Sequence, residues 1–565
     1  MPFSEKNSIH QLTFLMQDYG IRHVVACPGS RNAPILHNLQ EAGFLLHPVT
    51  DERSAGFVAL GLRLAEQASG AGPVAVCVTS GSALLATLPA VAEAYYRRSP
   101  LLIVSADRPL HRLGQLEGQM LPQEGALEPY ARTYNLTEEK TDADTLANNR
   151  LLNEALSRLC AEPWGPVHIN LRVEEPLFRF TRASLQPVRH ISYAENPPVP
   201  GMSAETLRMI SEARLPALVF GQWEAGELPE VTVLRQCNKM LVLPEVISGQ
   251  GGSEMTAVFD LLLGRKSCPA DLPVPDVVLH AGGNAVGKQI KLYLRRQQSL
   301  QVIRMDSTGE FIDTFDHLAR VEKCDIREAL PALAASLPVN PEVEAAHRRL
   351  NAAVRSIAAY HPRTFSDFGV MQALAKHLAD TPSILHTANS TSIRHAALLF
   401  SAGLHRIFAN RGVNGIEGSL STAVGHAMGS NEPVYVMIGD LSLFYDINAL
   451  GISPLPPTLR IVLFNNHGGQ IFHRLPGLEQ SPALTQYIAA AHPHCARGIA
   501  RGFGLRYFSA KRYDELQEGL AAMTTPPETE SPAAMLLEVF TRPTDNEEER
   551  ISLENWMETA YRATT

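Results

Sequence analysis

The apolar residues of this chain fall into short runs, separated by longer stretches in which apolar and polar positions alternate at helical spacing. In the first part of the chain the runs are HVVAC (23–27), VAVCV (74–78), LLIVS (101–105) and VHINL (167–171). Helical patterns lie between them, as at 54–67 and 82–98. Apolar strands that alternate with amphipathic helices predict a parallel sheet covered by helices on both faces.

The same alternation occurs twice more. After a Pro-rich join at 186–201, the predicted strands are ALVFG (217–221), MLVLP (240–244), VVLHAGG (277–283) and LQVIRMD (300–306). After a charged helical segment at 341–360, they are SILHT (383–387), RIFAN (406–410), VYVMI (434–438), RIVLF (460–464) and MLLEV (535–539). A polar loop at 524–532 precedes the last strand.

These three units predict an α/β protein of three domains, each a mostly parallel sheet flanked by helices. We place the domains at 1–185, 190–338 and 362–565. The likeness of the two flanking units suggests that one fold has been duplicated. The length of 565 residues agrees, since a domain takes about 150 residues.

Composition narrows the class of protein. With 45% hydrophobic and 19% charged residues the chain is typical of a globular protein, and its net charge of −9 argues against a nucleic-acid surface. No stretch approaches the roughly 18 apolar residues of a membrane span, and the start has no signal-peptide pattern. Seven scattered cysteines without a CxxC pair predict reduced thiols in a cytoplasmic protein.

The stretch from Gly439 to Gly469 carries the clearest chemical signal. A Gly-Asp turn follows the strand VYVMI, and the next strand, RIVLF, ends in NNHGG. If these strands are parallel neighbours, Asp440 and Asn466 both follow strand ends and face one another. Carboxylate, amide and backbone oxygens are suitable ligands for Mg²⁺ or Ca²⁺ that also binds phosphate. If the Gly-Asp pair stood by itself, the simpler interpretation would be an aspartate that caps a helix.

This pattern resembles the diphosphate-binding motif of thiamine-diphosphate enzymes. The resemblance implies thiamine diphosphate as cofactor, with Asp440, Asn466 and the carbonyl of Gly468 holding Mg²⁺ or Mn²⁺. The same turns would supply further cofactor contacts from Gly439, Leu441, Ser442, Gly469, Gln470, Ile471 and Phe472.

Glu52 begins a predicted helix in the first domain, in TDERSAGFVALGLRLAEQ. By itself it is most simply a first-turn acid that the helix dipole favours. In thiamine-diphosphate enzymes a glutamate in this context binds the pyrimidine ring and sets the tautomer that activates the cofactor. The resemblance implies this role for Glu52, with the site assembled across a homodimer.

Two glycine-rich turns extend the resemblance. VTSGSALLATLPA places Gly81 where the backbone approaches the pyrimidine, although Ala86 stands where many relatives have asparagine. RGVNGIEGSLSTAVGHAMG opens a helix whose N-terminus could accept a diphosphate. Ile416 in that turn would be the apolar wedge that bends the cofactor, or more simply a core residue.

Cationic side chains follow several predicted strand ends. They are Arg31 with Ser30, Arg108, Arg394 with Ser390, and Arg411, to which Lys288 is added from the middle domain. Ligands of α/β sheets bind at this edge, and arginine binds carboxylates with two hydrogen bonds. Each cation alone is more simply a surface charge, but together they predict a pocket for polyanionic substrates.

Taken together, the motifs closely resemble the menaquinone-pathway 2-succinyl-5-enolpyruvyl-6-hydroxy-3-cyclohexene-1-carboxylate synthase family. They are CPGSRNAP, TDERSAG, TSGSA, SADRP, NSTSIR, NRGVNGIEGSLSTA, GDLSLFYDINAL and NNHGGQIF. The family implies decarboxylative carboligation of 2-oxoglutarate with isochorismate by 1,4-addition, in homodimers paired into a homotetramer. Both substrates are dicarboxylates, which accounts for the arginines.

The resemblance also distributes roles among the residues. Ser390, Arg394 and Arg411 would hold carboxylates near the reacting carbon. The remaining substrate surface would be formed by Ser30, Arg31, Arg108, Gln119 and Lys288, with an apolar wall of Ile471, Phe472 and Leu475. Gln289 stands where some members have a second cation beside the lysine. The resemblance does not assign individual arginines to individual substrates.

Three alternatives stay open. One is a 2-oxoglutarate decarboxylase; a decarboxylase of small 2-oxo acids, by contrast, would need few cations and would more often have histidines where this chain has Leu441 and Ser442. An enzyme like acetohydroxyacid synthase would commonly bind FAD as well. A non-catalytic relative would often have lost the activating glutamate, and Glu52 disfavours that interpretation.

Overall fold

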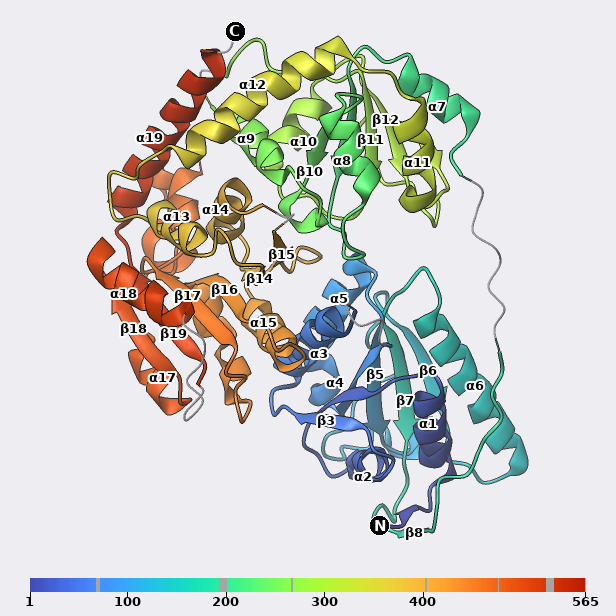
Figure 1. The fold of residues 1–565 in the computed structure, drawn as a ribbon. Helices are drawn as coiled ribbons and strands as arrows, with labels where there is room; N and C mark the ends of the chain where they lie inside the picture. Colours follow the sequence, from blue (N-terminus) through green and yellow to red (C-terminus); the bar gives the residue numbers. More distant parts are fainter. Residues whose placement is uncertain are drawn as a thin grey trace.

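The computed structural model describes residues 1–67, 72–192, 201–265, 268–401, 404–475, 477–524 and 533–563. Within these ranges the chain forms three large parallel sheets flanked by helices, and one two-stranded antiparallel ribbon, β1–β8 (Figure 1). The predicted α/β class with three sheets is therefore confirmed. Half of the Pro-rich join at 186–201 and most of the polar loop at 524–532 lie outside the described residues, and the domain boundaries stay predictions.

The first sheet has the strand order β3-β2-β4-β5-β7-β6, and every pairing in it is parallel. The strands of this domain are β1 Phe3–Ser4, β2 His23–Ala26, β3 Leu45–Pro48, β4 Val74–Val78, β5 Leu101–Asp107, β6 Arg132–Leu136, β7 Val167–Arg172 and β8 Phe180–Arg182. Its helices are α1 Asn7–Asp18, α2 Ala33–Glu41, α3 Glu52–Gln67, α4 Ser82–Ala86, α5 Leu88–Arg97 and α6 Asp142–Cys160.

The third sheet repeats this topology, with the order β15-β14-β16-β17-β19-β18. Its strands are β14 Ser383–Thr387, β15 His405–Phe408, β16 Val434–Gly439, β17 Leu459–Asn465, β18 Arg506–Ala510 and β19 Met535–Phe540. The accompanying helices are α13 Asp367–His377, α14 Thr391–Leu399, α15 Ser419–Met428, α16 Asp440–Tyr445, α17 Arg497–Gly502 and α18 Tyr513–Thr524. In both sheets the strands, counted along the chain, lie in the order second, first, third, fourth, sixth, fifth, as duplication of one fold requires.

The middle sheet is a shorter parallel sheet, β10-β9-β11-β12-β13. Its strands are β9 Pro216–Phe220, β10 Leu241–Pro244, β11 Val277–Ala281, β12 Gln301–Met305 and β13 Leu318–Glu322. Its helices are α7 Ala204–Ser211, α8 Pro229–Gln236, α9 Ser253–Leu263, α10 Lys288–Arg295 and α11 Ile326–Ser336. α12, Pro341–Ala358, leads to the third domain, and the last helix, α19 Pro543–Arg562, returns to share one apolar core with α12 and α9.

Every strand predicted from an apolar run is present, with ends displaced by at most two residues. In the three large sheets the predictions omitted β3, β6, β13 and β18, which are all edge strands, whereas the edge strands β10 and β15 were predicted; β1 and β8 of the ribbon were omitted too. Each of the four omitted edge strands leaves several side chains partly or fully exposed, so its sequence has no continuous apolar run. The helical stretch at 82–98 is divided at Thr87, because Pro89 has no N–H to continue the first helix.

The first and third domains meet where α3 crosses α15 (Figure 1). The helices touch backbone to backbone: a Cβ on Gly61 would lie 2.0 Å from the Thr422 carbonyl oxygen, and one on Gly425 would lie 2.1 Å from that of Val58. Both positions therefore exclude any side chain. The loop that precedes α15 also reaches α3, since a Cβ on Gly418 would lie 2.3 Å from a ring carbon of Phe57.

Candidate active site

The predicted metal-binding turn forms at the carboxyl edge of the third sheet. β16 and β17 are parallel neighbours, with Gly439 opposite Phe464, so Asp440 and Asn466 follow adjacent strand ends as predicted. Asp440 is 3% exposed, and its Oδ2 accepts a hydrogen bond from the Gly468 N–H at 3.0 Å. Burial raises the pKa of Asp440, while hydrogen bonds from backbone N–H groups act against that rise.

The other two predicted ligands are held in place by the surrounding chain. Asn466 Nδ2 donates to Asp367 Oδ2 at 3.0 Å, which fixes the side-chain amide and leaves its oxygen for a ligand. Gly468 has φ 137°, and a Cβ there would lie 2.6 Å from the Ala489 carbonyl oxygen, so only glycine fits.

This donor set fits a magnesium-type ion. Carboxylate, amide and carbonyl oxygens are hard ligands, as Mg²⁺ and Mn²⁺ require. Across the described ranges no cluster of three or more His, Cys, Asp and Glu side chains could hold a metal. A Cβ added to Gly439, at the start of the turn, would meet no atom within 4 Å, so the approach to the turn is open.

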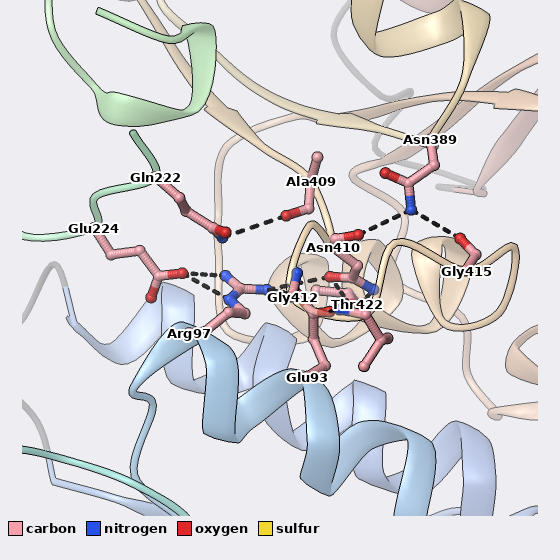
Figure 2. A network of polar contacts seen from close by, with 11 residues as sticks. Glu93, Arg97, Gln222, Glu224, Asn389, Ala409, Asn410, Gly412, Gly415 and Thr422 are labelled. Atoms are coloured by element: carbon pink, nitrogen blue, oxygen red, sulfur yellow. Dashed lines mark hydrogen bonds and ion pairs between the residues drawn. The ribbon is translucent and has the colours of Figure 1, made fainter. Parts of the chain in front are cut away.

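Ile416 is not a core residue. It is 46% exposed, in the loop between β15 and α15. Its carbonyl oxygen accepts a hydrogen bond from Ser442 Oγ at 2.5 Å, so the loop is attached to the metal-binding turn. Asn389 Nδ2 donates to the carbonyl oxygens of Asn410 and Gly415, both at 2.8 Å (Figure 2).

Glu52 is the first residue of α3 and is half-buried. Its neighbours contact the third domain of the same chain: Arg53 Nη2 donates to the Tyr445 carbonyl oxygen at 2.9 Å, and Asn448 Nδ2 donates to Asp51 Oδ2 at 2.7 Å. The start of α3 therefore lies against the segment that follows Asp440.

Gly81 and Gln119 come together in the first domain. Gly81 has φ 84°, and a Cβ there would lie 3.1 Å from the Gln119 carbonyl oxygen. Its N–H donates to Gln123 Oε1 at 2.8 Å, which ties the turn to the interior of the domain. The Gln119 side chain is exposed, as is that of Ser30.

Arg31 and Arg108 lie near one another, but Arg31 is largely engaged by its own domain. Its Nη1 donates to the Val173 carbonyl oxygen at 3.0 Å, and its Nη2 lies 3.1 Å from Glu175 Oε1. Burial, followed by the charge of Arg108, lowers the pKa of Arg31. Arg108 Nε is buried without a hydrogen-bond partner among the described residues.

Arg394 and Arg411 form the second cationic pair. Arg411 Nη1 donates to Asn389 Oδ1 at 3.1 Å and also to Asn414. Burial lowers the pKa of Arg411 first, and the nearby positive charge of Arg394 lowers it further. Ser390, just before α14, adopts φ 73°, a left-handed conformation that is uncommon for serine.

Lys291 in α10 lies within electrostatic range of Arg411, one turn after Lys288, whose role stays a prediction. Lys288 is exposed at the start of α10, whereas the charges of Arg411 and Glu245 act on the pKa of Lys291, which burial lowers. Burial raises the pKa of Glu245 to about 7, and its Oε1 accepts the Gly287 N–H at 3.0 Å. Lys291 was not among the predicted site residues, although it lies about one helical turn after Lys288.

Two further residues near the site were also missed. His492 Nε2 lies 3.4 Å from Asp440 Oδ2, and the His492 ring stacks on that of His494. Glu93 on α5 accepts hydrogen bonds from the loop that carries Arg411 (Figure 2). The HPH triplet at 492–494 was the available signal for the first; nothing local marked the second.

Comparisons with known proteins identify the first domain as one that binds thiamine pyrophosphate in its family. Residues 8–127 match the family described as thiamine pyrophosphate enzyme, N-terminal TPP binding domain. The chain is 39% identical over 549 residues to a 2-succinyl-5-enolpyruvyl-6-hydroxy-3-cyclohexene-1-carboxylate synthase of Bacteroides thetaiotaomicron, covering 95% of this chain and 96% of that protein.

Two other relatives carry the same name. The protein of Phocaeicola vulgatus is 38% identical over 555 residues, covering 95% of this chain and 96% of that protein. The protein of Desulfotalea psychrophila is 34% identical over 558 residues, covering 95% of this chain and 99% of that protein. A solved structure from Mycobacterium smegmatis shares the fold, with a TM-score of 0.67 at 19% identity, covering 95% of this chain and 99% of that one. No helix in the described ranges has the length and apolar character needed to cross a membrane.

Proposed function

The chain belongs to the family of 2-succinyl-5-enolpyruvyl-6-hydroxy-3-cyclohexene-1-carboxylate synthases, thiamine-diphosphate-dependent transferases of menaquinone biosynthesis, and we propose that it joins 2-oxoglutarate to isochorismate with loss of CO₂. The observation that carries this proposal is a single loop. Residues 411–418 connect Arg411, beside Arg394, to Ile416, which is hydrogen-bonded to the Asp440 turn. Two arginines that can bind substrate carboxylates therefore lie close to the Asp440 turn, whose oxygen ligands suit a metal ion bound to a diphosphate.

The roles proposed for the cofactor-binding residues are those that the family resemblance implies, and the chemistry of the side chains suits them. Thiamine diphosphate, when bound, supplies the carbon nucleophile and electron sink for decarboxylation and carbon–carbon bond formation. Asp440, the Asn466 amide oxygen and the Gly468 carbonyl would hold Mg²⁺, or Mn²⁺, at its diphosphate. Glu52 would accept a hydrogen bond from its pyrimidine ring, and Ile416 would support its bent shape.

The substrate residues act by binding and orientation. Arg394 and Arg411 each offer a guanidinium fork that matches a carboxylate, and Ser390 can donate one further hydrogen bond. Since both substrates are dicarboxylates, pairing their charges lets two like-charged molecules occupy one site. In the net reaction the electron pair left by CO₂ forms the new carbon–carbon bond, and one proton is taken up.

The assembly and location of the protein extend the same proposal. A homodimer, paired into a homotetramer, would cover apolar side chains that one chain leaves exposed beside the site: Ile416, Tyr445 and Leu475. All seven cysteines are unpaired, which supports a reducing compartment such as the cytoplasm.

The test is incubation of the purified protein with thiamine diphosphate, Mg²⁺, 2-oxoglutarate and isochorismate, following CO₂ and the joined product by mass. We expect CO₂ release to depend on isochorismate and to equal the joined product in amount. CO₂ release at the same rate without isochorismate would favour a 2-oxoglutarate decarboxylase. No turnover of either substrate would favour a non-catalytic relative.

A further inference from the structure

Glu93 is a fully buried acid on α5 of the first domain, and it contacts the backbone of the third. Its Oε1 accepts a hydrogen bond from the Gly412 N–H at 3.0 Å, and its Oε2 accepts one from the Val413 N–H at 2.8 Å (Figure 2). One carboxylate therefore binds two successive amides directly after Arg411.

The approach of this carboxylate depends on glycine. A Cβ on Gly412 would lie 2.8 Å from Glu93 Oε2 and 3.0 Å from the Glu93 carbonyl oxygen. Any larger residue would push the loop off the acid. The contact therefore requires a particular residue on each side. Glu93 is required to accept the two amide hydrogen bonds, and Gly412 is required because there is no space for a side chain.

Arg97, one turn after Glu93, joins the middle domain to the same junction. Its Nε donates to Glu224 Oε1 at 2.7 Å, and its Nη1 donates to Asn410 Oδ1 at 3.1 Å (Figure 2). The Arg97 side chain is 1% exposed, and its Nη1 lies 3.9 Å from Glu93 Oε1. Glu93 therefore has a buried counter-charge, and all three domains contribute to one polar network.

The third domain fixes the rest of the loop. Asn389 Nδ2 donates to the carbonyl oxygens of Asn410 and Gly415, while Asn389 Oδ1 accepts from Arg411 Nη1 at 3.1 Å. The two amides between these points, at Gly412 and Val413, are the ones that Glu93 holds. Without Glu93 this stretch would lose its anchor in the first domain.

We propose that Glu93 is a positioning residue for the carboligation: by holding the Gly412 and Val413 amides, it sets the Arg411 guanidinium and Ile416 in register with the Asp440 turn. The inference rests on the function proposed above for Arg411 and Ile416. It implies that the relative position of the first and third domains is transmitted directly to substrate binding.

The test compares Glu93→Gln with Glu224→Gln in the full-length protein. Both substitutions remove a negative charge beside Arg97, but only Glu93→Gln turns a side-chain NH₂ toward one of the loop amides. Hydrogen–deuterium exchange is measured first, without cofactor or substrate. We expect amides of 411–416 to exchange about tenfold or more faster in Glu93→Gln and within about threefold of wild type in Glu224→Gln.

Steady-state kinetics of the cofactor-loaded enzyme follows. Glu93→Gln should raise the KM for at least one dicarboxylate substrate by about tenfold, with a smaller change in Glu224→Gln. If Glu93→Gln folds poorly, Gly412→Ala takes its place in the test. It displaces the loop while keeping the acid, so we expect the same faster exchange and the same rise in KM.

Unchanged exchange at 411–416 in Glu93→Gln, or an equal effect of Glu224→Gln, would overturn the inference. Faster exchange with unchanged KM values would also overturn it. Glu93 would then hold the loop in the wild-type protein, but its hold would not affect substrate binding. If the wild-type protein makes no joined product, the proposed function fails separately, and the exchange data still decide whether Glu93 holds the loop.

Discussion

At the scale of single residues, Asp440 combines two requirements that oppose each other. The side chain is buried, which penalises its charge, yet a hard-oxygen metal site needs that charge. The Gly468 and Leu441 N–H groups donate to its oxygens at 3.0 and 2.7 Å and so favour the ionised form. A bound divalent cation would stabilise the ionised carboxylate further.

Replacing Asp440 by Ala should therefore remove metal-dependent cofactor binding. Cofactor and Mg²⁺ at a hundredfold excess over the dissociation constant should stabilise the wild-type protein by about 2.7 kcal/mol, seen as a rise in the thermal unfolding midpoint. The variant should show no rise. Glu212→Ala, which breaks an exposed ion pair in the middle domain, is the control and should keep it. A normal rise in Asp440→Ala would mean that the metal binds elsewhere.

Replacing Glu52 by Gln should separate binding from activation. The proposed metal ligands lie in the third domain, so the variant should retain the thermal shift produced by cofactor and Mg²⁺. Turnover should fall by about 10²-fold or more, because a neutral amide cannot set the pyrimidine tautomer as a carboxylate does. Turnover is followed as joined product by mass; a rate close to that of wild type would remove Glu52 from the mechanism.

How far the sequence predicted the site depends on the distance over which each residue acts. Asp440 and Asn466 were predictable because parallel strands end at one edge, and the structure has them there. Glu93 was not predictable, since its partners lie more than 300 residues away and nothing near it in the sequence marks them. Lys291 was missed because the motif drew attention to Lys288, which the structure leaves exposed.

At the scale of elements, the crossing of α3 and α15 connects the two domains that supply the proposed cofactor site. Gly61 and Gly425 allow the helix backbones to touch, so the close packing of the two domains depends on the absence of side chains at these two positions. Central strands were predicted well, because a strand buried on both faces has an apolar run. Four edge strands, β18 among them, were missed because they lack one, whereas the edge strand β10 has such a run and was predicted.

Gly425→Ala should therefore destabilise the domain contact. Its Cβ would lie 2.1 Å from the Val58 carbonyl oxygen, and overpacking of this kind typically costs about 1–3 kcal/mol. Gly498→Ala in α17 is the matched control, since a Cβ there meets nothing within 4 Å and alanine favours a helix. We expect a lower thermal midpoint for Gly425→Ala alone; equal midpoints would contradict the tight crossing.

At the scale of the whole molecule, two sheets of identical topology flank a third, and the site draws on both. Family resemblance implies that Glu52 and Asp440 of one site come from different chains of a dimer. Within one chain, however, Arg53 and Asp51 already contact Tyr445 and Asn448. These contacts favour the competing arrangement, in which one chain supplies both Glu52 and Asp440 to a site, and a measurement on mixed dimers separates the two arrangements.

The most direct measurement is complementation between Glu52→Gln and Asp440→Ala, co-produced with different tags, with the mixed dimer isolated and the joined product measured. Each variant alone should be inactive. If two chains build each site, the mixed dimer has one intact site of its two and should recover about half of the wild-type activity. A mixed dimer as inactive as its parents would contradict a cofactor held between Asp440 of one chain and Glu52 of the other.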